Sequence, residues 1–204
     1  MQSGIYDDFV NRFVKASSAI NIGDPTDPST MIGPLAYNAC RETAERYIES
    51  AKADGATLLL GGAPPTTAEL SQGAYVIPTI FEVTDHKLEL MQEEIFAPVV
   101  GIMKFDAPDD AVRYVNDCRY GLCASIWTRD FRLALKLIDR LEVGTAWVNQ
   151  HLKIVPETPW GGCKESGWTK ENSILVFDEY TYHKHVWLNL DEKPRTFWED
   201  RILF

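Results

Sequence analysis

Three short apolar segments alternate with two stretches of helical periodicity between Val99 and Val148, and this alternation constrains the fold of the chain. Residues 99–105, 123–127 and 145–148 are short, apolar and β-prone, so each is a predicted strand. Strands that alternate with helices form βαβ units with right-handed crossovers. The sequence therefore predicts an α/β fold in which helices flank a parallel twisted sheet. Ligands bind such sheets beyond the carboxyl ends of the strands.

Cap residues mark where the helices of this repeat begin. Asp106 is the predicted N-cap of a helix with Pro108 in its first turn, and Asp130 is the predicted N-cap of the next helix. Two earlier helices are predicted from apolar residues at near-helical spacing. One covers residues 5–20, and the other ends at Gly55.

Further strands are predicted outside the repeat. Residues 57–60 indicate a short buried strand, and residues 75–83 are β-prone, with Pro78 indicating an edge or a bulge. Residues 179–190 alternate aromatic or apolar with polar side chains. A terminal strand without a hairpin partner often pairs with another subunit, so this segment is a predicted oligomerisation strand. We expect one domain over residues 1–178, then this strand, then a tail over residues 191–204 without an assigned role.

Composition excludes several classes of function. The net charge is −10 and no Lys or Arg cluster exceeds a pair, which argues against nucleic acid and anionic membrane surfaces as partners. The sequence shows no signal peptide and no apolar run of about 18 residues, so a cytoplasmic protein without a membrane span is expected. The four cysteines have no metal-ligand spacing, so neither a metal site nor a disulfide framework is predicted. They are Cys40, Cys118, Cys123 and Cys163.

Two adjacent carboxylates, Glu93 and Glu94, lead directly into an apolar run that contains Phe96 and Pro98. A carboxylate at the rim of a core can accept two hydrogen bonds at once, which suits the paired hydroxyls of a ribose. Phe96 can lie against an adjoining ring. The alternative is that both carboxylates are solvated surface charges, because carboxylates are rarely buried without a partner.

A second candidate run, residues 158–171, combines a Pro, an indole, a Gly pair and a further Gly. Glycines allow a close backbone approach, and Trp160 can supply an apolar wall. The alternative for Trp160 is an ordinary core tryptophan.

With these runs in this order, the chain resembles the C-terminal, catalytic and oligomerisation part of the NAD(P)-dependent aldehyde dehydrogenase superfamily. The resemblance extends from Ile5 to Val186 without a large gap. Six ordered motifs carry it: Gly23-Asp-Pro with Gly33-Pro34, Gly73-Ala-Tyr-Val-Ile-Pro-Thr-Ile, Glu93-Glu-Ile-Phe-Ala-Pro, Asn116 with Tyr120-Gly-Leu, Gly144-Thr-Ala-Trp-Val-Asn149, and Pro159-Trp-Gly-Gly-Cys-Lys-Glu-Ser-Gly167 followed by Glu171 and Tyr180.

The resemblance implies roles for individual residues. Glu94 would bind the ribose hydroxyls on the nicotinamide side of NAD or NADP, and Phe96 would pack beside that ribose and ring. Asn149 would lie at the end of the strand that forms the floor of the active site. Trp160 would line the aldehyde tunnel, and Glu171 would be a proton-relay partner of the general base. The alternative for Glu171 is a solvated pair with Lys170.

The resemblance also implies a substrate loop, and the sequence departs from the family pattern at two places. Residues 150–157 would form the loop that sets substrate shape, with Leu152 and Ile154 in the tunnel. Ala97 stands where the family usually has Gly, which is strained only if its φ is positive. Thr169 and Lys170 replace a usual Gly-Arg, and Lys cannot make the bidentate contacts of Arg.

The chemistry that the resemblance implies is oxidation of an aldehyde to a carboxylic acid through a cysteine thiohemiacetal. In the family, the nucleophilic cysteine and the dinucleotide-binding domain precede the segment matched by Ile5. We therefore expect no nucleophile or general base here and an inactive chain when it is alone. Cys163, next to Lys164, is the disfavoured substitute.

Two other functions are alternatives to the role as part of such an enzyme. The first is that the chain is a non-catalytic assembly module of the same fold. Alternatively, the parent protein acts on a semialdehyde or an acyl phosphate in the reductive direction. The expected partners are an aldehyde substrate in the intact enzyme and, through residues 179–190, further copies of the chain.

Overall fold

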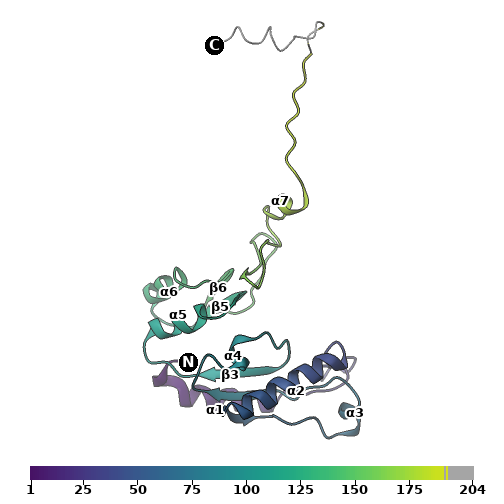
Figure 1. The fold of residues 1–204 in the computed structure, drawn as a ribbon, viewed down its shortest axis with the longest axis vertical. Helices are drawn as coiled ribbons and strands as arrows, with labels where there is room; N and C mark the ends of the chain where they lie inside the picture. Colours follow the sequence, from purple (N-terminus) through teal and green to yellow (C-terminus); the bar gives the residue numbers. More distant parts are fainter. Residues whose placement is uncertain (191, 193–204) are drawn as a thin grey trace.

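The computed structural model describes residues 1–190 and residue 192, and it has an α/β architecture with mixed sheets. Its strands form three small sheets, one in the N-terminal half and two in the C-terminal half (Figure 1). The single continuous sheet predicted from the sequence is therefore wrong in connectivity, while the fold class is confirmed.

The N-terminal sheet has the order β1-β2-β3. β1 (Thr57–Leu60) runs antiparallel to β2 (Thr79–Val83), and β2 runs parallel to β3 (Val99–Met103). The predicted strand over residues 75–83 begins only at Thr79, directly after Pro78, because proline cannot donate to the ladder. β1 is exposed at its start, which corrects the expectation of a buried strand.

Helices cover both faces of this sheet. Successive residues of β2 point to opposite faces, so each face contributes apolar side chains to a separate core. Phe81 and Val83 pack against α2 (Asn38–Ala53), in a core that includes Ala44, Ile48 and Ala51. Ile80 points to the opposite face and packs with Tyr6 and Ile102 beneath α1 (Tyr6–Ser18). Both predicted helices are confirmed, and Gly55 follows α2 with φ +84°, a conformation that favours glycine. The short elements of this half are η1 (Ser3–Ile5), α3 (Ala68–Ser71) and α4 (Glu89–Gln92).

The C-terminal half contains the predicted strand-helix-strand unit. β5 (Cys123–Ile126) pairs in parallel with β6 (Thr145–Val148), and α6 (Phe131–Ile138) connects them. The predicted N-cap is confirmed, since the side chain of Asp130 accepts a hydrogen bond from Leu133 N at 3.0 Å. A second small sheet pairs β4 (Tyr120–Gly121) antiparallel with β7 (Cys163–Lys164).

Two predictions about the strand-helix repeat over residues 99–148 are wrong. β3 pairs with β2 and not with β5, because α5 (Pro108–Asn116) leads the chain from the first sheet to the second. The N-cap of α5 is Ala107 instead of Asp106. The first turn is closed by Asp110, whose side chain accepts from Ala107 N at 3.3 Å.

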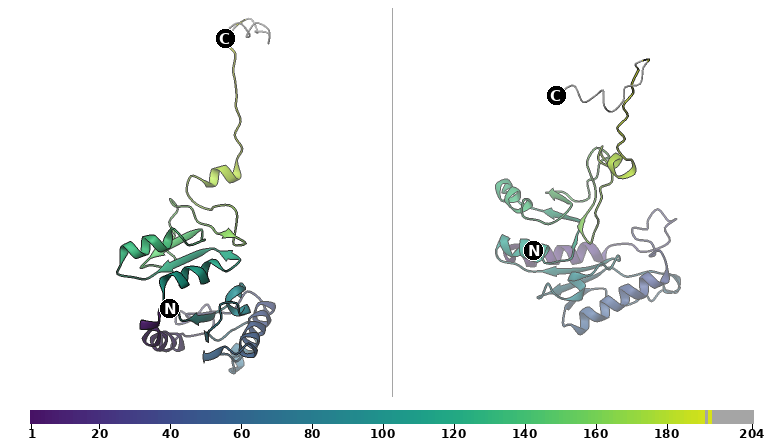
Figure 2. Two further views of the ribbon diagram at one scale, coloured as in Figure 1. Left: turned by 60° about the vertical axis from the view of Figure 1, so that its left-hand side comes forward. Right: turned by 45° about the horizontal axis from the view of Figure 1, so that its top comes forward.

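The predicted oligomerisation strand over residues 179–190 is not confirmed. Glu179 and Tyr180 belong to α7 (Val176–Tyr180), and residues 181–190 continue as an extended segment without a strand partner in the described chain. Figures 1 and 2 show this segment leading away from both halves of the fold. A strand forms only where another edge supplies hydrogen bonds, and among the described residues no strand pairs with this segment. The predicted tail lies outside the described residues, apart from residue 192.

Among the residues that the structure describes, no helix has the length and apolarity needed to cross a bilayer.

Candidate active site

The segment that follows α4 separates its side chains into two sets. Ile95 and Ala97 pack against the core between α2 and the sheet, while Glu94 and Phe96 are exposed. Phe96 is 87% exposed and has φ +54°, a left-handed conformation that is uncommon for a bulky residue. Ala97 is not among the positive-φ residues, so its replacement of glycine introduces no strain here.

The two adjacent carboxylates differ in their partners. Glu93 forms a charged hydrogen bond with Arg119 Nη2. The carboxylate of Glu94 has no hydrogen bond or ion pair to any residue in the described part of the chain. Of the two acidic side chains, Glu94 is therefore the one available to an external ligand.

Asn149 lies directly after β6, as predicted, and both the oxygen and the nitrogen of its side-chain amide form a hydrogen bond. Its Oδ1 accepts from Thr128 N and its Nδ2 donates to Thr128 O, both at 2.9 Å. Its φ of +54° is tolerated by asparagine more readily than by most residues. The amide thus holds the end of β6 to the segment after β5.

Trp160 and Glu171 are backbone neighbours. Trp160 N donates to Glu171 O at 2.8 Å, and Glu171 N donates to Trp160 O at 2.7 Å. The side chain of Glu171 is exposed, and Lys170 Nζ donates to the carbonyl oxygen of Gly162. Lys170 therefore holds the turn through a single hydrogen bond, whereas the guanidinium of an arginine could form two parallel ones.

The loop over residues 150–157 is tied to Trp160 through Trp147, a residue that the sequence reasoning did not single out. The rings of Trp147 and Trp160 lie 5.8 Å apart, and Trp147 Nε1 donates to Lys153 O at 2.9 Å. Leu152 and Ile154, the two predicted tunnel residues of the loop, are both exposed. The only sequence signal for Trp147 was its place two residues before Asn149.

His151 is a second residue that was missed. Its Nδ1 lies 2.7 Å from Ser125 Oγ, and its ring meets that of Trp147 edge-on at 5.5 Å. These contacts hold the start of the loop over residues 150–157 against β5 and β6.

The four thiols are all half-buried and unpaired. Cys163 Sγ donates to Glu142 O at 3.1 Å, with Gly121 O at 3.4 Å. Burial raises the pKa of Cys123 above its usual value, which keeps that side chain in the thiol form. Cys118 Sγ lies 3.9 Å from Gln92 O. None of these surroundings is the electropositive, open environment of a reactive thiolate.

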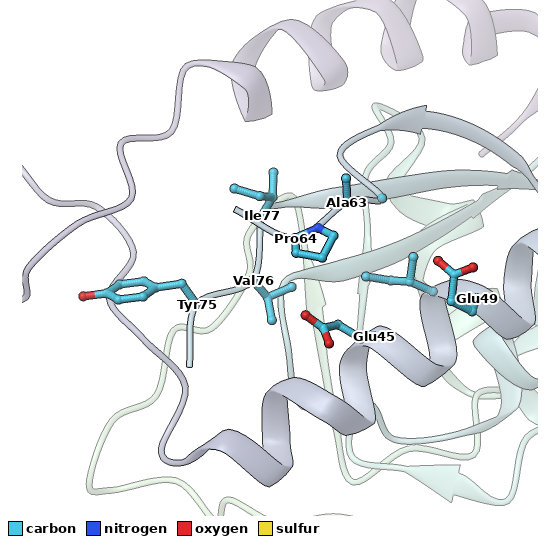
Figure 3. Close-up of a pocket in the computed structure, with 9 residues that line it drawn as sticks. Glu45, Glu49, Ala63, Pro64, Tyr75, Val76 and Ile77 are labelled. Carbon is cyan, nitrogen blue, oxygen red and sulfur yellow. The ribbon is translucent and has the colours of Figure 1, made fainter. Parts of the chain in front are cut away.

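The cavity drawn in Figure 3 is separate from these residues. It has a volume of about 180 Å³ and lies between α2 and two apolar segments, residues 62–64 and 75–77. Glu45 and Glu49 project into it from α2, and both are already paired, with Arg41 and Lys52 respectively. Within the described residues, no group of three or more His, Cys, Asp or Glu side chains is placed to hold a metal ion.

Comparison with known proteins identifies the family. The model of the aldehyde dehydrogenase family matches residues 1–186. Over 188 residues the chain is 39% identical to a betaine aldehyde dehydrogenase of Mesorhizobium japonicum, covering 92% of this chain and 39% of that protein. A betaine aldehyde dehydrogenase of Rhizobium etli is 38% identical over 190 residues, with 93% and 39% covered.

Solved structures agree with the sequence comparisons. A putative aldehyde dehydrogenase from Burkholderia cenocepacia superimposes with a TM-score of 0.89 at 34% identity, covering 96% of this chain and 40% of that one. The Staphylococcus aureus betaine aldehyde dehydrogenase in complex with NAD+ gives 0.87 at 30% identity, with 95% and 40% covered. The chain thus spans about two fifths of the length of the relatives it matches.

Proposed function

Because the chain belongs to the aldehyde dehydrogenase family, we propose that it forms one side of the active site of an enzyme that oxidises an aldehyde to a carboxylic acid with NAD(P)+. The observation that carries this proposal is that the two adjacent carboxylates differ in whether they have a partner within the chain. Glu93 is bound to Arg119, while Glu94 is free and exposed two residues before an exposed, left-handed Phe96.

Glu94 and Phe96 fit the nicotinamide end of the cofactor. A free carboxylate accepts hydrogen bonds from both hydroxyls of a ribose, and an exposed phenyl ring offers a flat apolar face to the adjoining ring. The left-handed φ of Phe96 directs its ring away from the core in which Ile95 and Ala97 are anchored. When bound, NAD(P)+ accepts the hydride that leaves the aldehyde carbon.

The other candidate residues would act on the substrate side. Trp160, Leu152 and Ile154 supply an apolar wall that excludes water, and Asn149 fixes the end of the strand below it. The exposed carboxylate of Glu171 would pass a proton to or from the general base. The names of the relatives make betaine aldehyde the first substrate to test.

The reaction requires a cysteine thiolate that adds to the aldehyde carbon and forms a thiohemiacetal. Loss of hydride from that carbon gives a thioester, and water then releases the carboxylic acid and restores the thiol. Cys118, Cys123 and Cys163 do not have the surroundings of that nucleophile. We therefore propose that the chain is inactive alone and that the nucleophile and the general base lie on another segment. A cytoplasmic location is part of the same proposal.

A role in assembly is the second candidate function, and one observation favours it. The extended residues 181–190 expose Tyr182, Val186, Trp187, Leu188 and Leu190, an apolar and aromatic surface unusual for an isolated segment. Such a segment can pair with a second copy of the chain in a homo-oligomer. This role is compatible with the enzymatic one and also fits a non-catalytic module.

The test is an assay of NADH or NADPH formation with betaine aldehyde. The chain is measured alone and then mixed with the N-terminal portion of one of the relatives. We expect activity only in the mixture. Glu94→Gln should raise KM for the cofactor, because the amide offers one acceptor oxygen where the carboxylate offers two. Glu69→Gln, at an exposed glutamate of α3 outside the candidate site, is the control and should leave KM unchanged. Activity of the chain alone would refute the assignment of the thiols, and an unchanged KM in Glu94→Gln would refute the ribose contact.

A further inference from the structure

The loop over residues 116–119, which we call the hub loop, contacts two separate parts of the candidate site. It begins at Asn116, the last residue of α5, and precedes β4. On one side lies the turn that carries β7, and on the other lies the segment over residues 86–93 that leads into Glu94 and Phe96.

Lys164 of β7 holds the hub loop from the first side. Its Nζ donates to Asn116 O at 2.7 Å and to Cys118 O at 3.0 Å, and it forms an ion pair with Glu142 at 2.7 Å. The backbone adds a further bond, from Glu165 N to Arg119 O at 3.1 Å.

Asp117 holds the segment over residues 86–93 from the second side. Its Oδ2 lies 2.6 Å from His86 Nε2 and 2.7 Å from Lys87 Nζ. His86 also packs against Tyr114 of α5, with ring centroids 4.7 Å apart. These contacts fix the beginning of the segment, seven residues before Glu93.

Arg119 reaches both sides with one guanidinium. Its Nη2 donates to Glu93 Oε2, its Nε lies 3.5 Å from Glu165 Oε2, and Nη2 lies 3.1 Å from the hydroxyl of Tyr120. A guanidinium presents several donors in a fixed plane, so one Arg can bind two carboxylates from different segments, which a lysine ammonium does less well.

We propose that Arg119 is a positioning residue that clamps the segment carrying Glu94 and Phe96 to the β7 turn and so fixes their orientation toward the cofactor. This inference rests on the proposed function of Glu94 and Phe96. Arg119 touches neither of these residues; it acts through Glu93, which is adjacent to Glu94 in the chain. The clamp also uses Glu93 as a structural partner, which leaves Glu94 as the ligand-binding carboxylate.

The experiment compares Arg119→Met, Arg119→Lys and Arg140→Met in the full 204-residue chain. Arg140 is the matched control because it is equally exposed, at 48%, and its guanidinium pairs across elements with Asp109 of α5 and with neither of the two clamped segments. Methionine keeps an unbranched apolar stem but removes the charge and the donors. Native-state hydrogen exchange is measured for the amides of residues 89–99 and 163–167, and nicotinamide mononucleotide is titrated to measure affinity.

We expect Arg119→Met to speed exchange in both segments roughly two- to fivefold, the range expected for a half-exposed charged contact. Arg119→Lys should lie between the wild type and Arg119→Met, and Arg140→Met should leave both segments unchanged. Affinity for nicotinamide mononucleotide should fall by about the same factor in Arg119→Met.

Each other outcome overturns one of the claims. Unchanged exchange in Arg119→Met would refute the clamp. Faster exchange with unchanged affinity would refute its positioning role. If nicotinamide mononucleotide binds the wild type no better than Glu94→Gln, the proposed cofactor contact fails, while the exchange measurement still decides whether the clamp exists.

Discussion

The side-chain amide of Asn149 forms two reciprocal hydrogen bonds with the backbone of Thr128, each 2.9 Å long. This pair joins the residue after β6 to the segment after β5, and it extends the parallel pairing of the two strands beyond their last residues. The asparagine side chain therefore stabilises the end of this sheet, directly before the loop that holds the candidate substrate residues.

Replacement of Asn149 should destabilise the chain measurably. Asn149→Ala removes both bonds and places alanine in a left-handed conformation, so we expect the free energy of unfolding to fall by about 1–3 kcal/mol. Asn149→Gly removes the same bonds but accepts the positive φ, and it should lose less. Urea unfolding of the three proteins measures both values. Equal losses in the two variants would show that φ contributes nothing.

The ion pairs of Asp117 should make stability sensitive to acid. Its bonds to Lys87 and His86 lower the pKa of the Asp117 carboxyl from 3.8 to about 2. Because the folded pKa is the lower one, the contribution is complete above the unfolded pKa and is lost as pH falls through the folded one. The difference in free energy of unfolding between the wild type and Asp117→Asn should therefore shrink between about pH 4 and pH 2. A carboxyl titration by NMR with a midpoint near the ordinary value would contradict this.

The two aspartates predicted as N-caps should respond differently to substitution. Asp130→Ala removes the acceptor for Leu133 N and should lower the free energy of unfolding by about 1 kcal/mol. Asp106→Ala should change it by less than about 0.5 kcal/mol, because Asp110 and not Asp106 closes the first turn of α5. Chemical denaturation distinguishes the two. A larger loss for Asp106→Ala would restore the cap expected from the sequence.

The core between α2 and the sheet depends on Phe81, which is completely buried. Phe81→Ala should lower the free energy of unfolding by about 3–5 kcal/mol through lost burial and the remaining cavity. Leu58, on the strand paired with Phe81, is 41% exposed. Leu58→Ala should therefore have a much smaller effect. Similar losses at the two positions would show that the β1 side of the sheet is covered in solution.

Self-association through the extended C-terminal segment should depend on its exposed apolar side chains. Trp187→Glu adds a charge to the surface formed by residues 181–190, so it should shift the chain from oligomer to monomer. Sedimentation velocity at several concentrations measures the shift. Trp168→Glu is the control, because Trp168 is also highly exposed, at 96% against 83% for Trp187, but lies outside the segment. An oligomer that persists in Trp187→Glu would exclude this surface.

The sequence by itself determined several local elements and the family. Near-helical spacing located α1 and α2, Asp130 marked the start of α6, and the ordered motifs identified the family. The roles of Glu94, Phe96 and Trp160 stay predictions. These features are local, because capping, periodicity and turn residues act over a few neighbouring positions.

Only the tertiary structure decided which elements pair and which side chains are free. It paired β3 with β2, assigned the cap of α5 to Asp110, and placed residues 181–190 in an extended segment outside the strand ladders of the described residues. It also distinguished Glu93 from Glu94, because Arg119, 26 residues after Glu93 in the chain, binds the carboxylate of Glu93. Contacts between residues far apart in the sequence depend on how the elements pack together. The sequence around Glu93 and Glu94 therefore does not show which of the two carboxylates binds a guanidinium.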